Sequence, residues 1–171
     1  MIRTNLSIFF ILFSMVSLCQ EDKQRGYIVK VGDKAPDFTA QLTDGNQITL
    51  QDLNGKVVML QFTASWCKVC RQEMPIIEEE IWQKQKDNGL VVIGVDRDEP
   101  LETVIAFGEK MKVTYPLALD PGAEIFSLFA HKKSGVTRNV IIDKEGNIAF
   151  LTRLFERKEF DDMKEAINKL L

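Results

Sequence analysis

Two cysteines separated by two residues, Cys67 and Cys70, are the part of the sequence best suited to chemistry. An apolar, β-branched run at residues 56–61 precedes them and predicts a buried strand, whereas residues 71–88 favour a helix. The pair is therefore expected where a strand ends and a helix begins. Free backbone N–H groups and the helix dipole stabilise an anion there, which lowers the pKa of a thiol and makes it nucleophilic near neutral pH.

The spacing of the pair predicts a disulfide that can open and close. Residues three apart lie on one face of a helix, so the two sulfur atoms can meet in a small ring. We expect Cys67, at the start of the helix, to be the exposed attacking nucleophile. Cys70, one turn further in, is expected to be the resolving thiol that releases a mixed disulfide.

Three other uses of a cysteine pair fit less well. Zinc usually takes four ligands, and the chain has one further cysteine, Cys19, and one histidine, His131. An inert disulfide over so short a loop would remove little entropy from the unfolded chain. A c-type haem site needs a histidine directly after the second cysteine, where Arg71 stands. We therefore expect a redox-active disulfide, no metal and no organic cofactor.

The sequence around the pair, Trp66 to Cys70, resembles the W-C-x-x-C motif of thioredoxin-fold oxidoreductases. Residues 32–38 are similar to the G-x-x-A-P-D-F opening of the extracytoplasmic TlpA/ResA-like branch, which is related to the AhpC/TSA redoxins, and residues 71–75 to its R-x-E-x-P. The resemblance covers residues 31–171, about one domain. It implies an exported oxidoreductase that acts on protein disulfides, in a reductase role fed by a membrane electron donor.

The N-terminus has the pattern of an export signal. Residues 6–18 are apolar apart from serines, too short to span a bilayer comfortably, so residues 1–19 are expected to be a signal peptide. An uncleaved anchor stays open as an alternative. Cys19 stands where a lipoprotein would carry its acylated cysteine, although Leu18 occupies a place that usually takes a small residue, so lipidation is left open. Residues 20–30 are expected to be a tether.

The rest of the chain predicts an α/β domain. Asp44-Gly45 is a hairpin signal, Pro75 is expected to kink its helix, and Pro116 makes residues 115–120 an expected edge strand. Strands are expected at residues 38–42, 47–50, 56–61, 90–95, 115–120, 136–143 and 148–152, and helices at 71–88, 101–112, 123–129 and 156–171. This order is the thioredoxin-like plan, a central mixed sheet flanked by helices, with an N-terminal extension and an inserted strand–helix segment.

Two residues near the pair determine whether a side chain there can exchange protons with the cysteines. Glu73 follows Cys70 by three residues and should share its helix face. The resembling family has an acidic residue there, and burial would raise its pKa enough for it to donate or accept a proton. A surface glutamate is the alternative. Gln61 stands where cytoplasmic thioredoxins have a buried aspartate, so no titratable group is expected at that point.

A loop far along the sequence is expected to face the cysteines. The resemblance places Thr137 where most of these proteins have a cis-proline that docks substrate, and the geometry of the bond before it is left open. Val136, Thr137 and Arg138 are the expected substrate-binding residues of this loop, together with Trp66 and Lys68 beside the pair. Lys68 should also favour the thiolate of Cys67.

Two other function classes are kept. A peroxiredoxin-like thiol peroxidase would reduce peroxides at Cys67, but Ala64 stands where that family has a hydroxyl. A non-catalytic binding module would use Trp66 and keep the disulfide as a structural bond. The net charge of −3 and the lack of a basic block argue against nucleic acid as a partner, and we expect a monomer.

Overall fold

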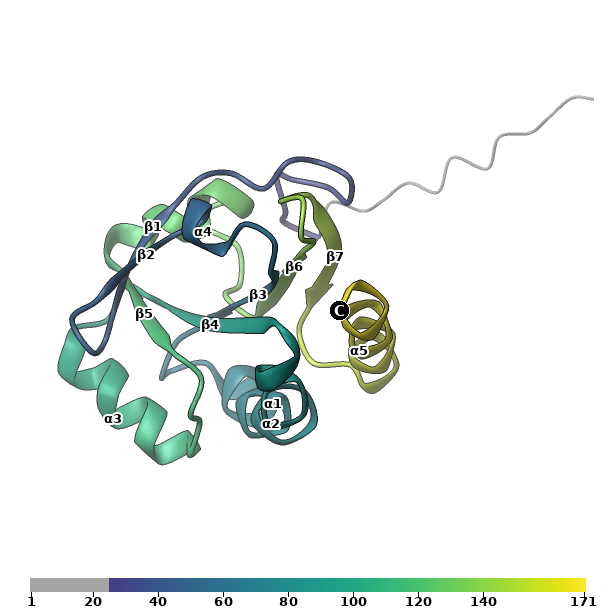
Figure 1. Ribbon diagram of the computed structural model, residues 1–171. Helices are drawn as coiled ribbons and strands as arrows, with labels where there is room; N and C mark the ends of the chain where they lie inside the picture. Colours follow the sequence, from purple (N-terminus) through teal and green to yellow (C-terminus); the bar gives the residue numbers. More distant parts are fainter. Residues whose placement is uncertain (1–24) are drawn as a thin grey trace, which may run out of the picture.

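A mixed β-sheet organises the computed structural model, which describes residues 25–171 (Figure 1). Its seven strands lie in the order β2-β1-β5-β4-β3-β6-β7. The bounds are β1 Thr39–Leu42, β2 Gln47–Thr49, β3 Val57–Thr63, β4 Leu90–Arg97, β5 Leu117–Asp120, β6 Arg138–Ile142 and β7 Ile148–Arg153. Strand β3, in the interior of the sheet, is buried along its whole length and pairs parallel with β4 and antiparallel with β6. The predicted thioredoxin-like sheet is confirmed.

Helices cover both faces of the sheet, as predicted (Figure 1). On one face lie α1 (Lys68–Ile77), α2 (Gln83–Gln85), α3 (Leu101–Met111) and α5 (Arg157–Leu170). The other face is covered by α4 (Glu124–Phe129) and the N-terminal extension. Alternate residues of the strands point to opposite faces, which gives two separate apolar cores.

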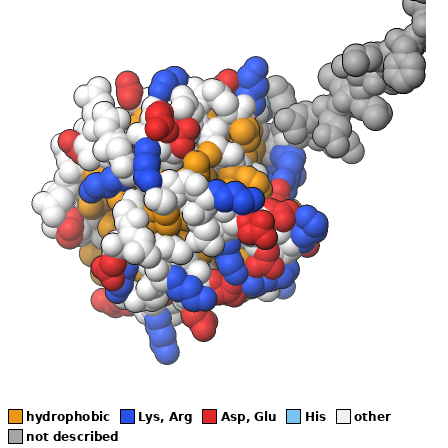
Figure 2. Space-filling model, turned by 45° about the vertical axis from the view of Figure 1, so that its right-hand side comes forward, with side chains coloured by type: hydrophobic (Ala, Val, Ile, Leu, Met, Phe, Trp, Pro, Cys, Tyr) orange, Lys and Arg blue, Asp and Glu red, His pale blue; other side chains and the backbone are white. Residues whose placement is uncertain are grey.

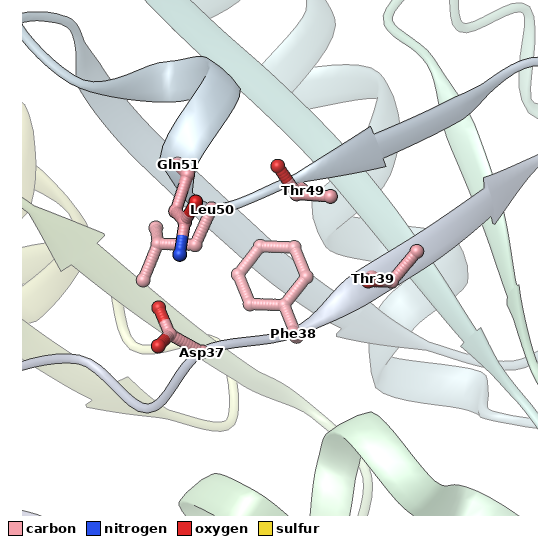
Figure 3. Close-up of a pocket in the computed structure, with 6 residues that line it drawn as sticks. All are labelled: Asp37, Phe38, Thr39, Thr49, Leu50 and Gln51. Atoms are coloured by element: carbon pink, nitrogen blue, oxygen red, sulfur yellow. The ribbon is translucent and has the colours of Figure 1, made fainter.

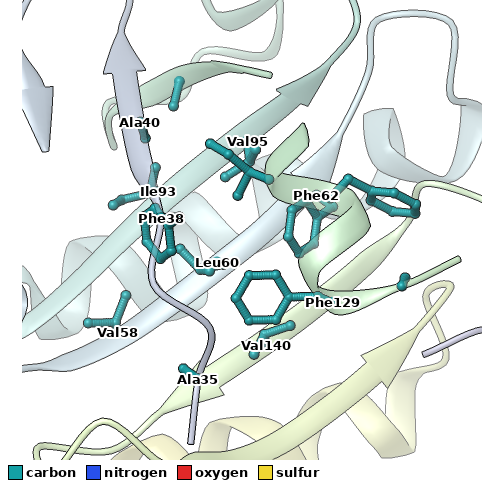
Figure 4. Close-up of a cluster of buried hydrophobic side chains, with 14 of the residues drawn as sticks. Ala35, Phe38, Ala40, Val58, Leu60, Phe62, Ile93, Val95, Phe129 and Val140 are labelled. Atoms are coloured by element: carbon teal, nitrogen blue, oxygen red, sulfur yellow. The ribbon is translucent and has the colours of Figure 1, made fainter. Parts of the chain in front are cut away.

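The core on the α4 face is aromatic. Phe62 of β3 contacts Phe126 and Phe129 of α4 at ring-centroid distances of 5.3 and 5.6 Å. Figure 4 shows Phe62 and Phe129 with Phe38, from the residues before β1, and aliphatic side chains of β3, β4 and β6 around them. Tilted and edge-on aromatic contacts of this kind add to the gain from burial. This core fixes the end of β3 that leads into the cysteine pair.

The long helix after the cysteines is interrupted. α1 contains Pro75, and a π-helical turn at Glu78–Trp82 separates it from α2. A 3₁₀ turn, Lys86–Asn88, follows and ends at Gly89, whose φ of 93° is the left-handed conformation that ends helices. Pro75 has no backbone N–H and so removes one α-helical hydrogen bond, and the π-helical turn begins three residues after it.

The strand predicted at the sheet edge is an interior strand. β5 is bordered by β4 on one side and by β1 on the other. Pro116 precedes the first residue of β5, so the proline removes no donor from the strand itself. The N-terminal hairpin of β1 and β2 adds two antiparallel strands beyond β5, and β2 becomes the edge.

Residues 25–30 lie against the domain instead of extending from it as a tether. Tyr27 is buried, and its hydroxyl donates to the carbonyl oxygens of Thr152 at 2.5 Å and Asn139 at 3.1 Å. The backbone N–H of Ile28 donates to the carbonyl of Phe129 at 2.9 Å. The predicted signal peptide, Cys19 and the first part of the predicted tether lie outside the described residues.

Neither a membrane-spanning helix in residues 25–171 nor, on the face shown in Figure 2, a large field of one charge is present. None of the helices in residues 25–171 is long and apolar enough to cross a membrane. On the face shown in Figure 2, lysine and arginine side chains alternate with aspartate and glutamate. A hollow of about 280 Å³ beside the β1–β2 hairpin is lined by Asp37, Phe38, Thr39, Thr49, Leu50 and Gln51 (Figure 3), and none of the predicted site residues lines it.

Candidate active site

Cys67 and Cys70 are joined in a disulfide between the end of β3 and the start of α1. Cys67 is the N-cap residue of α1, and its Sγ accepts a hydrogen bond from the backbone N–H of Cys70 at 3.2 Å. The predicted junction is therefore present, with the sulfur of Cys67 at the positive end of the helix. An opened pair would keep the thiolate of Cys67 at this N–H group.

The two sulfur-bearing residues differ in access. Cys70 is fully buried, whereas Cys67 keeps 8% exposure. The order is the expected one, but Cys67 is much less exposed than the sequence suggested, because other parts of the chain cover it. Trp66 beside it is 60% exposed, and Lys68 is also exposed. Access to the disulfide is thus through the Cys67 side, next to an exposed indole ring.

The cover over Cys67 is the loop that precedes β6. The hydroxyl oxygen of Thr137 lies 3.1 Å from Sγ of Cys67 and 3.3 Å from Sγ of Cys70. The structure therefore brings Thr137 to both sulfurs, as the family resemblance implied. The peptide bond before it is trans, as are all others in the described residues. Val136 next to it is 2% exposed.

Arg138 does not lie on the substrate side where we expected it. Successive residues of an extended chain point to opposite faces, so Arg138 turns away from the sulfurs that Thr137 contacts. Its side chain is fully buried, and its guanidinium lies over the rings of Tyr27 at 5.1 Å and Phe126 at 5.6 Å on the α4 face. This position corrects its expected place beside the sulfurs, on the side that Thr137 occupies.

Glu73 lies inside the protein on the α1 side of the sheet. It is 1% exposed, and its Oε1 accepts a hydrogen bond from the side-chain amide of Asn139 at 2.7 Å. Burial raises the pKa of Glu73 to about 7, and the hydrogen bond from Asn139 limits the rise. Nε2 of the neighbouring Gln61 has no hydrogen-bond partner among the described residues. Gln61 is itself fixed, because its Oε1 accepts from the hydroxyl of Tyr115 at 2.7 Å. Glu73 is thus the buried carboxyl that the spacing predicted, one helical turn beyond Cys70.

The described residues contain no group of three or more histidine, cysteine, aspartate or glutamate side chains arranged to hold a metal ion. His131 lies exposed on its loop. The redox-active group that the described residues do contain is the disulfide itself.

Comparisons with known proteins agree with this geometry. The family described as AhpC/TSA matches residues 31–151. The chain belongs to the AhpC/TSA family. It is 33% identical over 127 residues to the thiol-disulfide oxidoreductase ResA of Bacillus cereus, covering 74% of this chain and 70% of that protein.

Solved structures lead to the same conclusion. A Bacteroides thetaiotaomicron protein provisionally described as a protein disulfide isomerase is 60% identical, with a TM-score of 0.83 over 85% of this chain and 92% of that one. The thioredoxin domain of a Bacteroides vulgatus thiol-disulfide oxidoreductase is 25% identical, with a TM-score of 0.70 over 82% of this chain and 97% of that one. This AhpC/TSA-family chain is therefore a thioredoxin-fold thiol-disulfide oxidoreductase whose redox-active pair is Cys67 and Cys70.

A second set of residues holds the loop before Cys67, and the sequence patterns did not reveal it. Glu99 accepts hydrogen bonds from the backbone N–H of Ser65 at 2.5 Å and from its hydroxyl at 2.6 Å. The guanidinium of Arg71 donates to the carbonyl of Ser65 at 2.6 Å. Ser65 is thus fixed from both sides, two residues before the nucleophile that the sequence predicts.

Asp96 lies close to Glu99, one of the residues that hold Ser65. It pairs with Thr63 where β4 runs parallel to β3, is fully buried, and neither of its carboxyl oxygens has a hydrogen-bond partner in the described residues. Burial raises the pKa of Asp96 to about 8, with further increases from neighbouring Glu99 and Asp120. The carboxyl ends of parallel strands meet at one edge of a sheet, so an acidic residue closing the strand at residues 90–95 was the signal that could have found it.

Proposed function

We propose that this thiol-disulfide oxidoreductase is exported, exchanges disulfides with partner proteins and acts as their reductase. The observation that carries the proposal is the unequal burial of a disulfide at a helix N-terminus. Cys67 is the N-cap residue and keeps some exposure, whereas Cys70 is fully buried. A partner can reach the first sulfur and not the second, which assigns attack to Cys67 and resolution to Cys70.

The reaction then has two balanced steps. In the reduced protein, the thiolate of Cys67 attacks one sulfur of a partner disulfide, an S–S bond forms to Cys67, and the other partner sulfur leaves as a thiolate. The thiol of Cys70 loses its proton and attacks Cys67. The second partner thiolate leaves, and the Cys67–Cys70 disulfide re-forms. Two electrons pass from the pair to the partner.

Glu73 is the group we assign to the proton of Cys70. It lies one turn further along α1, is buried, and has a pKa of about 7, so both its protonation states are populated near neutral pH. Its ionised form would accept the proton that Cys70 loses before attack, and its protonated form would return it when the pair is reduced.

Docking of a partner is assigned to the rim around Cys67. Trp66 offers a large exposed ring, and Lys68 offers an exposed cation at the first turn of α1. Thr137 would donate its hydroxyl hydrogen to the attacking sulfur, since its oxygen lies 3.1 Å from Sγ of Cys67. The side chain of Val136 is buried in the core on the α4 face, so this residue would meet a docked peptide through its backbone and not through its side chain.

Export follows from the apolar N-terminal sequence, and a reductase outside the cytosol needs a source of electrons. We therefore assign the supply to a membrane electron donor. Lipid attachment at Cys19 would keep the protein near that donor, and a monomer suffices for the chemistry because both sulfurs come from one chain.

Trapping of the mixed disulfide tests the assignment of the two sulfurs. Cys70→Ser should accumulate a covalent adduct with a disulfide-bonded substrate protein, seen on a non-reducing gel and lost on reduction. Cys67→Ser is the matched control and should trap none. Adducts on Cys70 in the Cys67→Ser variant would contradict the assignment.

The reduction potential of the Cys67–Cys70 pair tests whether the protein acts as a reductase or as an oxidant of its partners. Equilibration of the wild-type pair in glutathione and dithiothreitol buffers should give a value near that of thioredoxin, about −270 mV. A value near −120 mV would make the protein an oxidant of folding proteins instead.

Peroxide reduction is the second enzyme activity to be considered. Rates measured on the wild-type protein distinguish it from disulfide exchange. Ala64 lacks the hydroxyl that would steer a peroxide, and it is fully buried. The wild-type protein should therefore consume hydrogen peroxide far more slowly than it reduces a protein disulfide. A pair that does not cycle with a mild dithiol at all would leave the binding-module alternative.

A further inference from the structure

A pocket with a cationic lining lies between residues 25–26, the loop at 133–135 and the adjoining ends of β6 and β7. Its volume is about 470 Å³. The lining residues that matter are Arg25, Lys133, Arg138, Arg153, Gly26 and Ser134. Four of these carry a positive charge and none a negative one. The pocket is separate from the disulfide, and the exchange steps above do not use it.

Arg138 is the buried part of this lining. Its side chain is fully buried, and one nitrogen, Nη2, donates to the carbonyl of Arg25 at 2.6 Å. Its Nε and Nη1 have no hydrogen-bond partner among the described residues. The rings of Tyr27 and Phe126 give it cation–π contacts, but a ring cannot replace the hydrogen bonds that a guanidinium loses on burial.

A second arginine faces the first. Arg153 of β7 lies directly opposite Arg138 of β6 in the antiparallel register, and its Nε is also buried without a partner in the described residues. Like charges directly opposite one another destabilise a sheet. The ion pair that Glu159 makes is with Arg25, whose Nη2 donates to it at 2.9 Å. Toward Arg153, Glu159 accepts only from the backbone N–H, at 3.5 Å, and Arg25 donates to the Arg153 carbonyl at 2.8 Å.

The backbone is shaped to admit the guanidinium. Gly26 has a φ of +85°, which a side chain would make unfavourable. A Cβ at this position would collide with the guanidinium of Arg138 and lie 2.9 Å from Cβ of Ser134. The glycine thus leaves the wall of the pocket open to the charged group.

We propose that this pocket binds an oxyanion, a carboxylate or phosphate group, between the guanidiniums of Arg138 and Arg153 with Lys133 at the rim. The planar, multi-donor guanidinium matches the paired oxygens of such a group, and an anion there would satisfy the unpartnered nitrogens and offset the facing charges. The anion belongs either to a small ion or to an acidic side chain of a partner protein. The second source rests on the proposed function: Gly135 lines the pocket, and Thr137, two residues later, contacts both sulfurs.

Amide NMR of the oxidised protein, titrated with sodium phosphate at constant ionic strength, tests the site. We expect saturable shifts at Gly26, Ser134, Gly135 and Arg153. Arg153→Gln should weaken binding about tenfold, as the loss of a charged hydrogen bond predicts. Lys133→Gln should weaken it less. Lys84→Gln removes an exposed charge on α2 and serves as the matched control, with unchanged binding.

A second arm distinguishes the two sources. Reduction rates are measured for a cystine peptide that carries a glutamate and for its glutamine counterpart, with and without phosphate. If phosphate slows reduction of the glutamate peptide alone, the anion is a carboxylate of a partner protein. If phosphate binds and changes neither reduction rate, the anion is a free ion. Failure of the exchange reaction itself would leave the NMR titration intact as a test.

Two results would overturn the site. One is a set of shifts that does not saturate, or that sodium chloride reproduces at equal ionic strength. The other is phosphate affinity unchanged in Arg153→Gln with a native amide spectrum. Either would leave Arg138 as a structural arginine held by its two aromatic neighbours.

Discussion

Glu73 and Asp96 are two buried carboxyls near the cysteine pair, and burial is the main cause of the raised pKa of each. They differ in the groups that surround them. Burial raises the pKa of Glu73 to about 7, while Asn139 donates a hydrogen bond to it and so favours its ionised form. Asp96 has no such donors and has Glu99 beside it, and its pKa rises to about 8. A buried acid that must exchange protons needs a hydrogen-bond donor that stabilises its ionised form. Of these two carboxyls, Glu73 has such a donor and Asp96 does not.

The largest expected effect is on the rate of exchange. Glu73→Gln keeps the shape and the hydrogen bond to Asn139 but cannot take up the proton of Cys70, so resolution of the mixed disulfide at pH 7 should slow by about 10². The pH–rate profile should also lose its inflection near 7. Glu79→Gln, an exposed position in the π-helical turn, is the control and should behave as wild type. Equal rates and equal profiles in both variants would remove Glu73 from the proton path.

Stability should depend on pH through the same residue. The folded-state pKa of Glu73 lies above its ordinary value of 4.5, so the folded protein binds more protons and the free energy of unfolding falls as the pH rises from about 4.5 to 7. The full shift corresponds to about 3 kcal/mol. Urea unfolding of the oxidised protein should show a decrease over this window that is much smaller in Glu73→Gln. A decrease of the same size in the variant would assign it to other groups.

A smaller effect is expected at the other side of the disulfide. Thr137→Val removes the hydroxyl that lies 3.1 Å from Sγ of Cys67 and keeps the volume of the side chain. Loss of one hydrogen bond to a charged sulfur should raise the pKa of the reduced Cys67 by about one unit. The pH dependence of alkylation by iodoacetamide measures this pKa. Thr137→Ser keeps a hydroxyl and should restore most of the wild-type value, unless the hydroxyl plays no part.

The sequence predicted the parts of the site that depend on local spacing. Cys67, Cys70 and Glu73 lie on one short stretch, so the period of the α-helix is enough to place them together. The order of strands in a known family also placed Thr137 near the sulfurs. Arg138 was placed wrongly because the face on which a strand residue lies depends on where the strand begins, and one residue reverses it.

The contact between Glu99 and Ser65 could not be predicted from the sequence, for a different reason. Glu99 follows β4, more than thirty residues after the loop it holds, and nothing in its neighbours marks it out from other loop acids. Its contact depends on the register between β3 and β4, which pairs Thr63 with Asp96. The interior position of β5 has the same kind of origin, since it depends on where a separate hairpin adds to the sheet.

The smallest expected effect concerns Asp96. Glu99→Gln keeps the hydrogen-bonding shape at Ser65 but removes a negative charge beside Asp96, so the pKa of Asp96 should fall from its value of about 8. Carboxyl-carbon NMR of the oxidised protein follows this titration directly. The raised pKa means that Asp96 lowers the free energy of unfolding as the pH rises towards 8, and the variant should show less of that decrease. The exchange rate at pH 7 should change far less than in Glu73→Gln, because a carboxyl without donors stays protonated there. A rate loss as large as that of Glu73→Gln would mean that Asp96, and not Glu73 alone, supplies protons to the pair.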